Sequence, residues 1–81
     1  MNNRHIVFHL QEALEQLQET LSSFENRKAD EVKLQIDLEH LYHHINTAWN
    51  SRNASEEETD ECSENNFKKW RQFPTDLEFL E

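Results

Sequence analysis

The chain contains no glycine, and it has a single proline and a single cysteine among its 81 residues. The absence of glycine excludes a glycine-rich phosphate-binding loop. The lone cysteine, Cys62, excludes an internal disulfide framework, and its acidic surroundings disfavour the thiolate, so we regard it as structural or incidental. No apolar run has the length of a membrane span, and the N-terminal segment is too polar for a signal peptide, so we expect a cytoplasmic protein.

Basic residues are also scarce. Eight lysine and arginine residues stand against 17 acidic ones, which gives a formal net charge of −9. Nucleic acids and anionic membrane surfaces both attract clusters of Lys and Arg, so the composition argues against either as a partner. Solubility explains the acidic excess most simply, and an acidic surface that neutralises a basic partner protein is the alternative.

Leucine at helical spacing is abundant. Two ladders of apolar residues step by three and four positions, which aligns them on one face of an α-helix. The first comprises Val7, Leu10, Leu14, Leu17, Leu21 and Phe24, and the second comprises Leu34, Leu38, Leu41, Ile45 and Ala48. They predict two amphipathic helices, over about 4–24 and 31–52. Tyr42 and Trp49 flank the second ladder and widen its apolar face.

Residues 25–30 are the expected turn between these helices. Asn3 is a good N-cap for the first helix, Asn26 tolerates the left-handed conformation that ends a helix, and Asp30 is a good N-cap for the second. Short connections between antiparallel helices are common, so a hairpin is favoured. One long helix is the alternative, since the turn holds neither glycine nor proline.

Hydrophobic residues make up 35% of the chain, which is little for a domain of this size. Oligomerisation is the natural source of the missing stability. We therefore expect an all-α fold, a helical hairpin over 1–54 with a C-terminal helix or arm over 55–81, in which two copies pair through their leucine faces into a four-helix-bundle-like homodimer. The dimer core would comprise both ladders as far as Ile45, together with Trp49.

The C-terminal region combines acidic and aromatic residues. Ser55 with Glu58 and Thr75 with Glu78 match capping boxes, and Pro74 should stop any helix before it. The acidic run after Ser55 repels itself and is expected to be partly mobile. The large apolar residues of the C-terminal region either fold back to cover the hairpin near Val32, Ile36, Tyr42 or Trp49, or dock into a partner protein. They are Phe67, Trp70, Phe73, Leu77, Phe79 and Leu80.

Histidine is over-represented. The five histidines are His5, His9, His40, His43 and His44, and two pairs have the i, i+4 spacing at which a helix presents two imidazoles to one zinc ion. A helical count on the leucine ladders places all five on outward positions, where they would not converge within one hairpin. They are therefore interpreted as exposed polar residues, with a metal site or pH-sensitive contact between subunits as the alternative.

The stretch from His40 to Asn50 (HLYHHINTAWN), with the aromatic and acidic tail, resembles small uncharacterised cyanobacterial proteins. The resemblance implies a bacterial, cytoplasmic origin and no activity. No catalytic motif is present, and a short hairpin encloses little volume for a substrate, so we predict a protein that is not an enzyme and has no cofactor. The predicted function is a non-catalytic protein–protein interaction module, an adaptor or regulator, with a metal-responsive protein and a neutraliser of a basic partner as alternatives.

Overall fold

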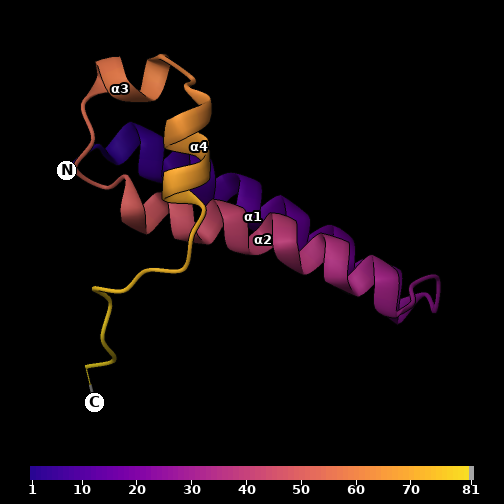
Figure 1. Ribbon diagram of the computed structural model, residues 1–81. Coiled ribbons are helices and arrows are strands. Elements are labelled where there is room, and N and C mark those ends of the chain that lie inside the picture. Colours follow the sequence, from indigo (N-terminus) through magenta and orange to yellow (C-terminus); the bar gives the residue numbers. More distant parts are fainter. Residues whose placement is uncertain (81) are drawn as a thin grey trace.

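The computed structural model describes residues 1–80 and contains four helices (Figure 1). These are α1 (Asn3–Glu25), α2 (Glu31–Asn50), α3 (Glu56–Asp60) and α4 (Glu64–Trp70). Helices α1 and α2 pack side by side as a hairpin, so the expectation of an all-helical fold built on a hairpin is confirmed, and no strand occurs in residues 1–80. None of the described helices has the length and apolar character needed to cross a membrane.

Local capping explains where the helices begin. The Asp30 side chain accepts a hydrogen bond from the Lys33 backbone N–H at 2.9 Å, and Ser55 and Glu58 form both halves of a capping box, as expected. The cap of α1 is Asn2 and not Asn3, because the Asn2 side chain reaches the N–H of His5 while Asn3 already belongs to the helix.

The turn between α1 and α2 also differs from the expectation by one residue. Arg27 adopts the left-handed conformation, with φ of 56°, whereas Asn26 has φ of −87°. The reason is that the Asn26 N–H still bonds to the Ser22 carbonyl, so α1 ends one position later than expected. The Lys28 N–H then closes the turn on the Ser23 carbonyl across the left-handed residue.

Helix α4 lies across the hairpin near the C-terminal end of α2 (Figure 1). Trp70 is buried there, and two asparagines of α2 hold the end of α4. Asn46 donates its side-chain amide to the Arg71 carbonyl, and Asn50 donates to the carbonyls of Trp70 and Gln72. The acidic run expected to be mobile thus belongs to a segment that forms two short helices.

The remaining C-terminal segment, residues 71–80, is not helical. It leaves the helices in an extended path (Figure 1), so the prediction of a second capping box at Thr75 and Glu78 is wrong. The competing partners are on α2: the Asp76 carboxylate accepts hydrogen bonds from the Trp49 indole at 2.9 Å and from Arg52 at 3.3 Å. These contacts fix the chain in an extended conformation where a helix would have started.

The seam between α1 and α2 is polar. We call the buried residues His9, Gln16, Thr20, Asp37 and His44, with the exposed His40 that is hydrogen-bonded to Gln16 and His44, the polar seam. Among residues 1–80 the only buried hydrophobic residues are Ala13, Ala48 and Trp70. Hydrogen-bonding side chains and two alanines therefore fill the centre of this seam, and Leu34, Leu38 and Leu41 of α2 are only partly buried beside it.

The leucine ladders flank this seam. On α1 a buried residue that faces α2 is followed directly by a leucine four times, at Leu10, Leu14, Leu17 and Leu21. On α2, Leu38 follows Asp37 and Ile45 follows His44 in the same way. Because the helices are antiparallel, positions displaced in the same sense from the seam lie on the same side of the hairpin. Both ladders thus form one surface, which we call the leucine face. It comprises Val7, Leu10, Leu14, Leu17, Leu21, Phe24, Leu34, Leu38, Leu41 and Ile45.

Candidate functional site

All five histidines of the chain lie next to one another, where α4 covers the hairpin. Ring centroids are 4.5 Å apart for His5 and His9, 5.2 Å for His9 and His44, and 4.7 Å for His44 with either His40 or His43. We call these five residues the histidine cluster. The prediction that they would not converge within one hairpin is wrong. The side of α1 that faces α2 carries the residues that immediately precede the leucines, His9 among them, and the leucines themselves lie to one side.

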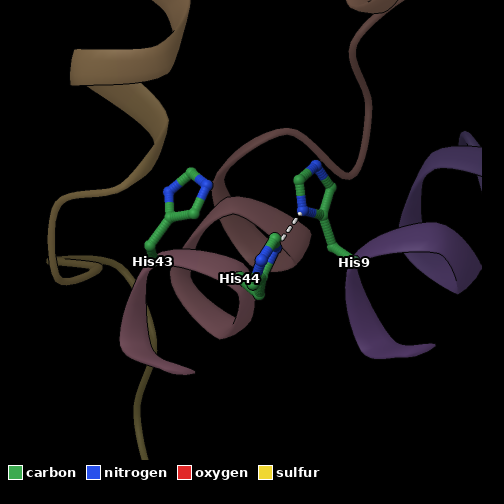
Figure 2. Close-up of side chains that lie close together, drawn as sticks. All are labelled: His9, His43 and His44. Carbon is green, nitrogen blue, oxygen red and sulfur yellow. Dashed lines mark hydrogen bonds between the residues drawn. The ribbon is translucent and has the colours of Figure 1, made fainter. Parts of the chain in front are cut away.

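Three members of the cluster present ring nitrogens to a common point. One nitrogen each from His9, His43 and His44 lies within 4.8 Å of the other two. Figure 2 shows His9 reaching across from α1 to the two adjacent histidines of α2. His9 and His44 are each only 7% exposed, and their Nδ1 atoms are 2.9 Å apart. Such a group is the kind of nitrogen-rich arrangement that holds a transition metal.

A chain of hydrogen bonds runs from these histidines along the polar seam. Gln16 donates its Nε2 to the Thr20 hydroxyl at 3.0 Å, so its Oε1 accepts from His40 Nδ1. With its Nδ1 donating, His40 accepts at Nε2 from His44 Nε2, at 3.0 Å. It follows that His44 Nδ1 accepts from His9 Nδ1, and the bonding pattern fixes the tautomers of all three rings.

The far end of this chain is anionic. The Thr20 hydroxyl lies 2.9 Å from the Asp37 carboxylate, which also accepts a hydrogen bond from Lys33 at 3.0 Å. The Lys33 and Thr20 hydrogen bonds lower the pKa of Asp37 below its usual value. A buried carboxylate thus closes the seam at the hairpin tip, with its charge matched by lysine.

Burial keeps the histidines neutral. Desolvation, followed by the neighbouring histidines, lowers the pKa of both His9 and His44 from 6.5 to about 4. Desolvation is also the main cause that lowers the pKa of His5 and of His43. Neutral imidazoles carry the lone pairs that metal ions require, so burial favours the ligating form of His9, His43 and His44.

A cavity of about 510 Å³ opens beside the cluster, between the start of α1 and the α3–α4 region. His5, His9 and His43 line it together with the aromatic rings of Phe8, Phe67 and Trp70. The His5 Nε2 atom is buried and has no hydrogen-bond partner. Among the described residues it is the one buried side-chain polar atom left in this state, and it lies at the wall of the cavity.

The aromatic residues expected in the C-terminal region are divided by the fold. Trp70 is buried, and Phe73 packs on Tyr42 with ring centroids 5.2 Å apart, which fits the fold-back interpretation. Leu77 is half exposed, whereas Phe79 and Leu80 are 93% and 99% exposed. Val32 and Ile36 also stay exposed, so the segment does not cover them.

The leucine face is the second candidate site. Leu10, Leu14, Leu17 and Leu21 are each between 50% and 57% exposed along the whole length of α1. Ile45 on α2 is exposed as well, and the α2 leucines are partly buried. A continuous apolar surface of this kind is typical of an interaction site.

Sequence reasoning did not identify Gln16, Thr20 and Asp37 as part of the site. Their signal is present, since each lies one position before a ladder leucine, and His9 and His44 precede Leu10 and Ile45 in the same way. A second, polar stripe at helical spacing beside a leucine stripe is the pattern that would have revealed the seam. Comparison with protein-family models, with curated proteins and with solved structures gives no match for this chain.

Proposed function

We propose that this chain is a non-catalytic helical interaction module, an adaptor or regulator, whose leucine face pairs with the same face of a second copy. The observation that carries the proposal is that seven of the ten apolar residues of the leucine face are exposed, on one side of a hairpin whose interior is largely polar. Two such hairpins, stacked face to face, make the four-helix-bundle-like homodimer expected from the leucine ladders.

A second copy suits this face better than an unrelated partner. The face spans both helices and is apolar from one end of α1 to the other, so a two-fold axis through its centre brings apolar residues against apolar residues. Covering it removes half-exposed leucines from water, at about 25 cal/mol for each Å² of apolar surface buried. The lone chain has only three buried hydrophobic residues in its described part and gains most from this cover.

Salt separates the homodimer from the alternative of a basic partner. Two chains of charge −9 repel each other, so added salt should strengthen a homodimer held by leucine contacts. Binding to a basic protein would instead weaken as salt rises, because screening removes the attraction. The acidic residues Glu56, Glu57 and Glu58 of α3 would then form the working surface.

Sedimentation velocity on the full chain tests the proposal. The double substitution Leu14→Glu and Leu17→Glu places two charges in the leucine face and should convert the dimer to a monomer. The matched control, Gln11→Glu with Gln18→Glu, adds the same charge at exposed positions outside the face and should leave the dimer intact. Identical behaviour of the two variants, or a wild-type chain that is monomeric at all salt concentrations, would contradict the proposal.

A further inference from the structure

We propose that His9, His43 and His44 bind a divalent first-row transition-metal ion, and that Zn²⁺ is the best fit. The site lies under α4, on the side of the hairpin away from the leucine face, so it is independent of dimer formation. Each of the three residues supplies one ring nitrogen, and all three nitrogens already lie within 4.8 Å of one another.

The spacing of the nitrogens is close to what zinc requires. A tetrahedral zinc with Zn–N bonds of about 2.0–2.1 Å holds its nitrogen ligands about 3.4 Å apart. The Nδ1 atoms of His9 and His44 are 2.9 Å apart, with one proton between them. For a metal to bind between them, the proton must move to His9 Nε2, which leaves a lone pair on both Nδ1 atoms. The two rings must then separate by about 0.5 Å, and the third nitrogen must move inward by up to about 1.4 Å.

The hydrogen bonds around His44 match the second coordination shell of a metal site. A ligating histidine usually donates its other ring N–H to a protein acceptor, which fixes the tautomer and the orientation of the ring. Here His44 Nε2 donates to His40 Nε2, leaving Nδ1 with its lone pair toward His9. His40 is held in turn by Gln16, so His40 is a positioning residue and not a ligand.

The donor set selects the metal. All three donors are neutral imidazole nitrogens, which suit zinc, copper and nickel, whereas magnesium and calcium require oxygen ligands. The nearby carboxylate of Asp37 is engaged by Thr20 and Lys33, and the exposed thiol of Cys62 is outside the three-nitrogen group. Three histidines leave one position of a tetrahedral ion for another ligand.

The cavity provides room for that fourth ligand. His9 and His43 line it, so the open position of a bound ion can face its interior, and its volume of about 510 Å³ far exceeds the volume of a water molecule. His5, with its buried and unpartnered Nε2, forms part of the same wall.

Isothermal titration calorimetry with zinc chloride, at neutral pH on the full chain, measures the binding directly. We expect one ion per chain and a rise of the melting temperature on zinc addition, because a ligand that binds only the folded state stabilises it. His43→Gln is the best ligand variant, since the only side-chain hydrogen bond of His43 is a long one, 3.4 Å to Thr47. Its ring also contacts Phe67 and His44, so the fold of the variant is checked by circular dichroism. Its zinc affinity should fall by more than about 100-fold, because a ligand is lost and not a supporting contact.

Three further variants sharpen the assignment. His9→Gln should abolish binding as His43→Gln does, and circular dichroism on both variants checks that the helices persist. His40→Gln should retain one ion per chain with an affinity about 10–100-fold weaker, as for a positioning residue. The matched control, Cys62→Ser, removes the thiol that lines the cavity and should bind zinc like the wild type.

Cobalt supplies a spectroscopic readout besides affinity. A Co²⁺ ion with three imidazoles should give visible bands of a tetrahedral or five-coordinate site and no thiolate charge-transfer band. The proposal is overturned if the wild type shows no saturable binding of either metal. It is overturned equally if His9→Gln and His43→Gln, shown to be folded, keep wild-type affinity, or if Cys62→Ser alone abolishes binding.

Discussion

The two sides of the hairpin differ in how far other parts of the chain cover them. On one side, α4 covers the histidine cluster, and Trp70 is left only 8% exposed. On the other side, the leucines of α1 remain about half exposed, and no described segment of the chain covers them. The C-terminal region of the chain thus covers the histidine cluster, whereas the residues that the structure describes leave the leucine face uncovered.

The polar seam lies between these two sides and depends on complete hydrogen bonding. Its imidazole, amide, hydroxyl and carboxylate groups are linked in sequence from His9 to Asp37. A buried polar group without a partner costs about 1–3 kcal/mol, so the loss of one member affects its neighbours. The seam links α1 to α2 by side-chain hydrogen bonds, while the leucine face lies on the surface of the hairpin.

Acidification should have the largest effect on stability, because it favours protonation of the buried histidines on the covered side of the hairpin. His9 and His44 have a pKa of about 4 in the folded chain and 6.5 as the ordinary value, so the unfolded chain binds protons first as the pH falls. Stability should therefore be greatest above pH 6.5 and decline down to about pH 4, by roughly 3 kcal/mol for each residue.

Urea denaturation between pH 7.5 and 4 measures this decline. His9→Gln removes one of the two titrating groups, so its stability should vary less with pH than that of the wild type. A free energy of unfolding that stays constant or rises as the pH drops through this window would contradict the burial of neutral histidines.

Trp70→Ala tests whether α4 is packed over the histidine cluster. Truncation of a buried tryptophan should cost about 3–5 kcal/mol, since it removes a large packed side chain and leaves a cavity. Phe73→Ala is the control, because the Phe73 side chain is mostly exposed and should cost much less. Thermal melts that respond equally to the two substitutions would show that α4 is not the cover.

Asp37→Ala tests the seam at the hairpin tip. The change leaves the Thr20 hydroxyl and the Lys33 ammonium without their common acceptor and should cost about 1–3 kcal/mol. The exposed neighbour Glu39, changed to Gln, should alter stability by less than about 0.5 kcal/mol. Chemical denaturation measures the loss of stability for each variant, and equal losses for Asp37→Ala and Glu39→Gln would contradict this role of Asp37.

Ile36→Lys should have the smallest effect. Ile36 is exposed and lies outside the leucine face, so a lysine there should change stability by less than about 0.5 kcal/mol and leave the dimer intact. Sedimentation velocity checks the second point. A monomeric Ile36→Lys chain would mean that the association surface is not the leucine face.

Much of the fold was predictable because it depends on local chemistry. The helix boundaries, the Asp30 cap and the Ser55–Glu58 capping box follow from residue spacing over a few positions. The Thr75–Glu78 motif has the same local signal and forms no helix, because Trp49 and Arg52 compete for Asp76. Such tertiary competition is invisible to a local pattern.

The histidine cluster was predictable only in part. The i, i+4 spacing of His40 and His44 raised a metal site only as the alternative to exposed polar residues, because the helical count assumed that leucines face the partner helix within the hairpin. The interface is instead rotated by one residue position toward the polar stripe, which brings His9 against His44. Two amphipathic helices with both an apolar and a polar stripe allow either arrangement, and the number of chains in the assembly decides between them.

The mass of the full-length protein in solution, measured by light scattering at micromolar concentration, tests the central claim most directly. The account predicts twice the chain mass of 9.8 kDa, because the leucine face needs a second copy to cover it. A mass of 9.8 kDa for a chain that still melts cooperatively would contradict it.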